Sequence, residues 1–331
     1  MAYTSIDDPE LYFQVKTYTG DGGTTQALTL GGSENMQPDL VWVKMRSEGQ
    51  SHILVDSVRG ANKYLGSNHD GGEGTDINSV TAFGSNGFTV GNDNAVNKSS
   101  GTYVAWNWKE SATAGFDILT YTGNDTNRTI SHSLSAVPHW ILIKATSRAD
   151  SWRVYHHKNT SAPATDYLVL NVADATSDSA SEFQDTVPTS SVFTLGTSGN
   201  VNRNSETFVA YLWSEKKGFS KFGSFVGNAN TDGPFVYTGF RPAWVLIKNS
   251  SANGENWNLF DNKRNGFNGS GEALRPNTNE VEYDRNVDFL ANGFKVRDSS
   301  GEVSGSGNTL VYMAFAESPL VNSNGVPTNA R

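Results

Sequence analysis

The sequence predicts an all-β protein made of three tandem antiparallel β-sandwich domains of a jelly-roll or lectin-like type, each about 100 residues long. Short apolar runs, rich in β-branched and aromatic side chains, alternate with clusters of Gly, Asn, Asp and Pro, which is typical of antiparallel sandwiches. The same ordered set of sequence anchors also occurs three times along the 331 residues, which indicates an internal repeat. No stretch has convincing helical periodicity.

The composition agrees with a turn-rich β-protein. Charged residues make up 18% of the chain, below the roughly 25% that is usual for globular proteins, and 33 residues are glycine. A hydrophobic fraction of 36% is enough for ordinary cores. The chain has no cysteine, which excludes disulfides, thiolate metal sites and a cysteine nucleophile.

Charge and terminal sequence narrow the classes of partner. A net charge of −9 and a pI near 5.2 oppose binding to phosphate backbones or anionic membranes. The opening MAYTSIDDPE lacks the basic and apolar regions of a secretory signal, and no apolar run approaches the length of a membrane span. We therefore expect neither nucleic acid nor a membrane as partner, and any outward destination is expected to be reached by assembly or lysis.

The first two anchors are short motifs at the start of each unit. One is an aromatic residue followed by glycine two positions later, and the other is a proline followed by an apolar strand that ends in lysine six positions later. The aromatic residues are Tyr18, Tyr121 and Phe225, and the prolines are Pro38, Pro138 and Pro242. In the second unit, alternation places Trp140 and Leu142 on one face of that strand and Ile141 and Ile143 on the other, so we expect it to be covered on both faces.

The other two anchors are aromatic positions in later strands. A ring residue opens a strand 14 or 15 residues after each proline, and a closing strand ends with a large aromatic residue two positions before a glutamate. The ring residues are His52, Trp152 and Trp257, and the closing aromatic residues are Trp108, Trp213 and Phe315.

These anchors set the predicted boundaries. The three units are expected at residues 12–110, 115–216 and 219–317, with connectors as short as three residues. We interpret the acidic residues 1–11 as an N-terminal docking segment. The Asn-, Pro- and Ser-rich residues 318–331 are expected to form a C-terminal tail of coil.

The eight tryptophans lie at or near the repeated anchors, so we interpret them mainly as core. The alternative is stacking on a glycan, for which Trp106 is the best candidate, because its counterparts in the other units are Tyr211 and Met313. The recurring strand-end lysines and closing glutamates are interpreted as solvated strand ends or as ion pairs within each unit.

We predict no catalytic, cofactor-binding or metal-binding residues, and therefore no enzyme. No nucleophile-elbow, phosphate-loop or dinucleotide motif is present, and no local motif selects a pair of carboxylates for glycoside hydrolysis. His156 and His157 are adjacent on a strand and point to opposite faces, so they cannot chelate one ion. The acidic loop 68–76 does not match an EF-hand; an exposed loop is favoured over a calcium site there.

At its anchors the chain resembles a family of virion proteins of marine tailed bacteriophages. The residues that carry the resemblance are IDDPELYFQVKTYTG from Ile6, PDLVWVKMRS from Pro38, DSVRGANKYL from Asp56, SNGFTVGNDNAVNKSSGTYVAWNWKE from Ser85, GFSKFGSFVGNANTDGPFVYTGFRPAWVLIK from Gly218 and VYMAFAESPL from Val311. Such sequences are similar to parts of tail fibres, receptor-binding proteins and other virion surface proteins. The family offers no catalytic residue to carry over.

The resemblance implies a structural virion protein that is assembled in the host cytoplasm. We expect a tail-fibre or receptor-binding component that contacts other virion proteins and host surface glycan, as a homo-oligomer and possibly a trimer. The alternatives are a head decoration or head fibre, a polysaccharide depolymerase, and, least favoured, a secreted lectin.

Overall fold

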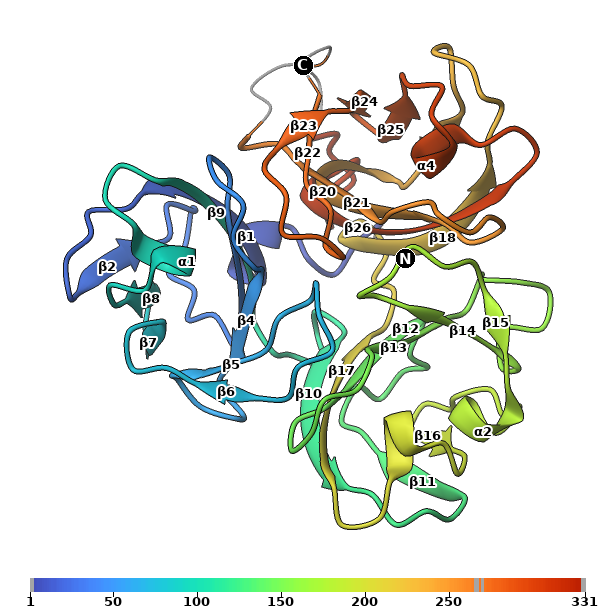
Figure 1. The fold of residues 1–331 in the computed structure, drawn as a ribbon. Helices are drawn as coiled ribbons and strands as arrows, with labels where there is room; N and C mark the ends of the chain where they lie inside the picture. Colours follow the sequence, from blue (N-terminus) through green and yellow to red (C-terminus); the bar gives the residue numbers. More distant parts are fainter. Residues whose placement is uncertain (1–2, 265–267, 269–270, 329–331) are drawn as a thin grey trace.

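The computed structural model describes residues 3–264, 268 and 271–328. The fold is nearly all-β, with several antiparallel sheets and four short helices in the described residues. Figure 1 shows three lobes around a common centre, coloured blue to cyan, green to yellow, and orange to red. These lobes 1, 2 and 3 contain the three predicted units in chain order.

Each lobe has an inner sheet near the centre, and the three inner sheets share one strand order. In lobe 1 the order is β1-β9-β3-β4, in lobe 2 it is β10-β17-β12-β13 extended by β14 and β15, and in lobe 3 it is β18-β26-β20-β21. The inner strands are β1 (Phe13–Thr19), β3 (Leu40–Met45), β4 (Ile53–Asp56) and β9 (Thr102–Trp108) in lobe 1; β10 (Phe116–Thr122), β12 (Trp140–Ala145), β13 (Arg153–His156), β14 (Asp166–Val169), β15 (Ser177–Asp178) and β17 (Thr207–Trp213) in lobe 2; and β18 (Ser220–Val226), β20 (Phe240–Asn249), β21 (Asn258–Asp261) and β26 (Thr309–Pro319) in lobe 3.

A smaller outer sheet covers each inner sheet on the side away from the centre (Figure 1). The outer strands are β2 (Gln26–Thr29), β7 (Val80–Gly84) and β8 (Gly87–Val90) in lobe 1; β11 (Arg128–Ser131) and β16 (Val192–Leu195) in lobe 2; and β19 (Phe235–Tyr237), β24 (Val287–Leu290) and β25 (Gly293–Val296) in lobe 3. Two-residue ladders pair β5 (Lys63–Tyr64) with β6 (Gly74–Thr75), and β22 (Glu272–Ala273) with β23 (Tyr283–Asp284).

One-turn helices precede the closing strands. They are α1 (Asn94–Asn97), α3 (Gly199–Asn202) and α4 (Gly301–Ser304), and lobe 2 also contains α2 (Ala180–Phe183). Helices α1, α3 and α4 each begin at an Asp or Ser N-cap whose side chain accepts from a backbone N–H. Four residues are too few to produce a helical period in the sequence.

Hydrophobic residues form four clusters. Three lie within single lobes, between an inner and an outer sheet, and the fourth combines residues of all three lobes. Strand β12 contributes side chains to two of these clusters, one from each of its faces. Trp140 and Leu142 belong to the central cluster, and Ile141 and Ile143 belong to the cluster of lobe 2. The prediction that this strand is covered on both faces is therefore confirmed.

The docking role predicted for residues 1–11 stays a prediction; the described residues 3–11 of this segment pack against the rest of the chain. Ile6 is 3% exposed and belongs to the central cluster, so its apolar side chain is removed from water. A 3-10 helix, η1 (Pro9–Leu11), follows it. The side chain of Asp7 accepts from the backbone N–H of Ser323, at 2.6 Å, so this N-terminal segment contacts the segment that follows β26.

The C-terminal prediction needs one correction. Strand β26 continues to Pro319, two residues beyond the predicted end of the third unit, because residues 318 and 319 still pair with β20. Residues 320–328 form turns with a single bridge between Val321 and Pro327.

The glycine of the first anchor is required by close backbone packing. A Cβ at Gly20, Gly123 or Gly227 would lie 2.2–2.3 Å from a carbonyl oxygen of the segment that follows the one-turn helix of its lobe. The aromatic residue two positions earlier is held at the same place: the hydroxyls of Tyr18 and Tyr121 donate to the carbonyls of Val96 and Val201.

We predict that Gly123→Ala lowers the free energy of unfolding by about 1–3 kcal/mol, because the methyl group must displace the Arg203 carbonyl, 2.2 Å away. Urea unfolding followed by tryptophan fluorescence measures the change. Gly31→Ala is the control, since no atom lies within 4 Å of a Cβ there. Equal stability of the two variants would contradict this account of the anchor.

Candidate functional site at the junctions between the lobes

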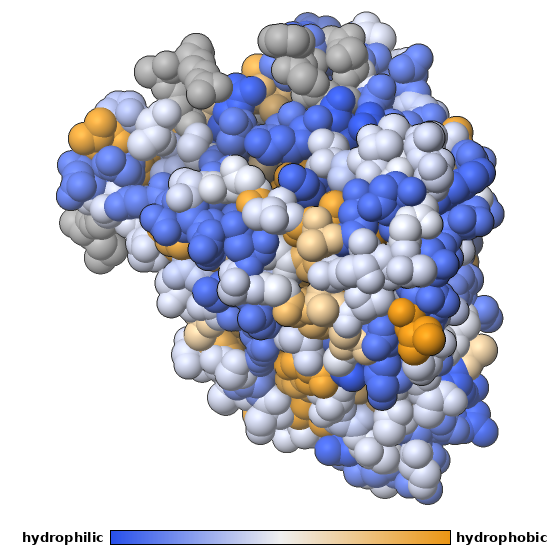
Figure 2. All heavy atoms as spheres, turned by 90° about the vertical axis from the view of Figure 1, so that its left-hand side faces the viewer, coloured by the Kyte–Doolittle hydropathy of each residue, from blue (hydrophilic) through white to orange (hydrophobic). Residues whose placement is uncertain are grey.

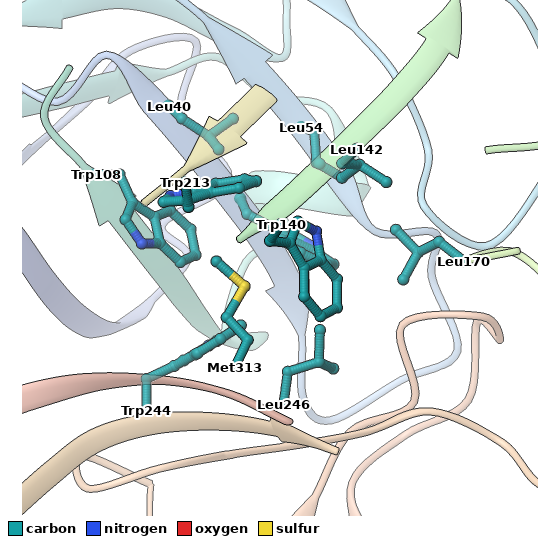
Figure 3. Close-up of a pocket in the computed structure, with 11 residues that line it drawn as sticks. Leu40, Leu54, Trp108, Trp140, Leu142, Leu170, Trp213, Trp244, Leu246 and Met313 are labelled. Carbon is teal, nitrogen blue, oxygen red and sulfur yellow. The ribbon is translucent and has the colours of Figure 1, made fainter. Parts of the chain in front are cut away.

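The centre of the molecule is an aromatic core. Trp108, Trp140, Trp213, Trp244 and Met313 point toward one another there, as Figure 3 shows. The rings of Trp108 and Trp244 cross at 90° with centroids 5.5 Å apart, a favoured aromatic geometry. The cavity that these side chains line has a volume of about 10 Å³, which is at most the space of one water molecule. The centre is therefore packed core and has no room for a ligand.

All eight tryptophans are buried, with exposures of 0–4%, which confirms that the rings are core. The interpretation of Trp106 as a glycan contact is wrong. Its side chain is 0% exposed, and its indole N–H donates to Oδ2 of Asp261 in lobe 3 at 3.0 Å. A glycan cannot reach a ring that lies between two lobes.

The ring residues of the third anchor connect neighbouring lobes. In each lobe one ring nitrogen lies 2.8–3.1 Å from a backbone carbonyl oxygen of a neighbouring lobe. The rings of lobes 1, 2 and 3 contact lobes 3, 1 and 2 respectively, so the contacts follow one rotational sense around the centre. The pairs are His52 with Arg275, Trp152 with Gly66, and Trp257 with Val169. The anchor recurs because all three junctions need a ring with a polar nitrogen at this position.

An asparagine that the sequence analysis missed holds each of these rings. The side-chain oxygens of Asn68, Asn171 and Asn277 accept from the backbone N–H groups of His52, Trp152 and Trp257 at 2.9–3.1 Å. A signal was available, because each asparagine follows a fully or almost fully buried Leu by three positions, at Leu65, Leu168 and Leu274. The variable distance between ring and asparagine, 16 to 20 residues, concealed it.

The recurring strand-end lysines are not solvated, so that interpretation is wrong. Lys44, Lys144 and Lys248 are 0% exposed. Each ammonium group donates to the carbonyl of the next residue in its own strand and to a carbonyl of a neighbouring lobe. The neighbouring carbonyls belong to Asn279, Asp70 and Ala173, at 3.1–3.4 Å. Burial lowers the pKa of each of the three lysines to about 8.

Buried carboxylates form a second connection at two of the three junctions. Asp56 accepts from the Tyr211 hydroxyl of lobe 2 at 2.7 Å and from Arg59 at 2.5 Å. Asp261 likewise accepts from Trp106 and from Arg264, at 3.0 and 2.6 Å. Both arginine side chains are also nearly buried, so each carboxylate is paired and hydrogen-bonded, as a buried charge requires.

At the third junction a neutral histidine replaces the carboxylate. His156 has the strand position of Asp56 and Asp261, and its Nε2 lies 3.1 Å from the carbonyl oxygen of Tyr312 in lobe 3. Burial, with a smaller effect of His157, lowers the pKa of His156 to about 3. His156 and His157 contact different carbonyls, those of Tyr312 and Phe222, and so do not converge on one ion.

The acidic loop 68–76 is a junction element, which corrects its interpretation as an exposed loop. Its Glu73 backbone N–H donates to the Thr146 carbonyl of lobe 2 at 2.7 Å, and its Asp70 carbonyl accepts from Lys144. Equivalent backbone bonds join Thr176 to Ser250 and Glu282 to Arg46. Each lobe therefore places one loop against the lysine-bearing strand of its neighbour.

The closing glutamates have three different surroundings. Glu215 and Glu317 form ion pairs with Lys221 and Arg241, at 2.9 and 2.6 Å, and not with the strand-end lysines as one interpretation proposed. Glu110 instead accepts from the backbone N–H of Ile118. Burial, together with the neighbouring Asp117 and Asp39 carboxylates, raises the pKa of Glu110 to about 7.

The remaining predicted anchors are placed at the same junctions or beside them. Pro38 and Pro138 are buried two residues before the lysine-bearing strands β3 and β12, and Pro242 is buried within the first residues of β20. Phe225 contacts Phe294 within lobe 3, and Phe315 packs against Trp108 and Trp244 at the centre. In the described ranges no group of three or more His, Cys, Asp or Glu side chains is arranged to hold a metal ion. No helix among those residues is long and apolar enough to cross a membrane.

The chain was compared with known families and with curated proteins. A family model described as "Domain of unknown function (DUF7483)" matches residues 8–319, which span all three lobes and their junctions. No significant match to a curated protein was found.

The three buried lysines should make the free energy of unfolding depend on pH. In the unfolded chain each lysine keeps its proton up to a pKa near 10.5, whereas the folded protein releases it near pH 8. Because the unfolded state binds more protons between these values, the free energy of unfolding rises with pH there, by up to about 1 kcal/mol per pH unit for each lysine.

We therefore expect the free energy of unfolding of the Lys144→Met variant to rise less steeply with pH than that of the wild type between about pH 8 and 9.5. Urea unfolding at a series of pH values measures the difference. Lys16→Met, at a partly exposed residue of β1, controls for the loss of a lysine as such. Parallel curves for the wild type and Lys144→Met would contradict the burial of a charged ammonium at this junction.

The carboxylate junction predicts energetic coupling between two lobes. Tyr211→Phe removes a donor from buried Asp56 and should cost about 1–3 kcal/mol of unfolding free energy. Combined with Asp56→Asn in a double-mutant cycle, it should show a coupling energy of at least about 0.5 kcal/mol. Additive effects would mean that the two residues do not stabilise each other across the junction.

Proposed function

The chain belongs to the DUF7483 family, and we propose that it is a non-enzymatic structural protein of a tailed-phage virion. In this proposal it is a tail-fibre or receptor-binding component that reaches the particle by assembly in the host cytoplasm and contacts host surface glycan. The phage assignment comes from the sequence resemblance. The structure supports the structural part of it, by the argument that follows.

One observation carries the structural role. Recurring polar and charged side chains connect the lobes: ring nitrogens and lysines contact backbone carbonyls of a neighbouring lobe, and asparagines hold the ring residues from within their own lobe. An enzyme would need such groups at a surface or in a cavity that substrate can enter. Here they lie around a packed aromatic centre, which is what a rigid scaffold requires.

The outer surface supports a binding role for the lobes. Figure 2 shows the face of lobe 1, which is mostly hydrophilic or intermediate, with small and separated hydrophobic patches. Loops rich in Asn, Ser and Thr connect the outer strands. Their amide and hydroxyl groups can donate to and accept from sugar hydroxyls, and the net charge of −9 disfavours polyanionic ligands.

The proposal is tested by locating the protein on intact particles, by cryo-electron microscopy or gold-labelled antibody. Density on the tail with threefold or sixfold symmetry is the expected result. Density over the head would make the protein a head decoration or head fibre instead, and absence from the particle would refute a virion role. The purified protein is also expected to release no new reducing ends from host polysaccharide; release would indicate a depolymerase.

A further inference from the structure

The outer faces of the three lobes differ at one pair of equivalent positions. Strands β2, β11 and β19 each place one buried residue opposite a buried phenylalanine of the neighbouring strand, which fixes their common register. The two residues that flank it point outward and are exposed. These residues are Ala27 and Thr29 in lobe 1, Thr129 and Ser131 in lobe 2, and Phe235 and Tyr237 in lobe 3.

Lobe 3 thus exposes two aromatic rings where the other lobes have small side chains. Phe235 is 46% exposed and Tyr237 is 52% exposed. Since they are two residues apart on one face of a strand, their backbone positions are separated by about 7 Å. Exposed apolar groups that adjoin one another at a surface commonly mark a binding site.

Neighbouring groups hold the two rings in place. A Cβ added to Gly293 would lie 3.1 Å from Cε2 of Phe235, so this ring lies against the backbone of β25. The hydroxyl of Tyr237 is 3.4 Å from that of Tyr3, which itself donates to the Gly239 carbonyl at 2.7 Å. The rings are therefore supported from below while their other surfaces remain in solvent.

Charged side chains form a rim beside the rings. Lys295 lies opposite Phe235 in the ladder, at the position of Thr89 and Thr194 in the other lobes. Its ammonium group is 2.8 Å from the carboxylate of Asp232, whose side chain is 79% exposed. The rim therefore supplies both a donor and an acceptor, and its opposite charges largely cancel.

These features favour a small neutral ligand over a protein. A stable protein interface buries about 800 Å² on each partner, far more than two half-exposed side chains on a three-residue strand provide. The balanced rim gives no attraction for a strongly charged partner. A pyranose ring has an apolar C–H face that packs on an aromatic ring and hydroxyls that reach donors and acceptors at its edge.

We propose that Phe235 and Tyr237 form a stacking surface for a neutral oligosaccharide, with Lys295 and Asp232 hydrogen-bonding its hydroxyls. The choice of ligand class rests on the proposed glycan-contacting function. The site is at the outer sheet of lobe 3, and not at the buried Trp106 that the sequence suggested.

The test compares the full-length wild type with Phe235→Thr/Tyr237→Ser, which copies the equivalent residues of lobe 2. Saturation-transfer-difference NMR is recorded with maltohexaose, cellohexaose and mannohexaose. We expect the wild type to bind at least one of them and the double variant to bind it at least tenfold more weakly, with an unchanged thermal unfolding midpoint. Phe235→Tyr, which keeps a ring, should retain binding, and Ile77→Thr, at a 73% exposed residue of lobe 1, should have no effect.

Three results would overturn the proposal. The first is that the wild type binds none of the three hexasaccharides, and the second is that the double variant binds them as well as the wild type does. The third is that the wild type self-associates in sedimentation experiments and the double variant does not. The last would assign the surface to a second copy of the chain. The assay needs no particle, so loss of the proposed virion function would be seen separately, as absence of the protein from particles while hexasaccharide binding remains.

Discussion

Burial of the inner sheets against a shared aromatic core is the constraint on which the rest of the molecule depends. Each inner sheet has one face covered by the outer sheet of its own lobe, and its other face carries tryptophan, leucine and phenylalanine side chains. Such a face is stable only when it is removed from water. The other two lobes provide the cover, so strands such as β3 and β12 are buried along their whole length. The central face of each lobe is therefore buried against both of the other lobes.

The shared core determines where polar groups must be paired. Backbone carbonyls and N–H groups at the lobe edges lose water when the lobes meet, and unpaired buried groups are costly. Ring nitrogens and lysine ammonium groups contact carbonyls of the neighbouring lobe in one rotational sense, and loop backbone N–H groups donate back across the same junctions in the opposite sense. The Asp56–Arg59 and Asp261–Arg264 pairs add specific geometry at two junctions, and the neutral His156 performs the same task at the third without a buried charge.

The sequence predicted the all-β class and the burial of the tryptophans, because strand patterns and aromatic anchors depend on local periodicity. It failed where a residue's environment is created by another lobe. Lys144 has the pattern of a strand end exposed to water, and nothing local shows that residues 70 and 145 will surround its ammonium group with carbonyls. Trp106 was judged by its variable counterparts, Tyr211 and Met313, although Tyr211 makes the same kind of contact as Trp106, a hydrogen bond to a buried aspartate of a neighbouring lobe. The aromatic pair on β19 was not recognised because register, which only the structure gives, aligns it with small residues elsewhere.

The contacts that join lobe 1 to 3, 2 to 1 and 3 to 2 are of one kind and close on themselves, as do the heterologous interfaces of a cyclic homotrimer. Three separate chains with these contacts would form such a ring only at a sufficient protomer concentration. Covalent fusion removes the dependence of such a ring on protomer concentration. It also removes the requirement for identical subunits. One copy can then exchange a carboxylate for a histidine, and another can acquire aromatic rings on its outer sheet, while the ring itself remains closed.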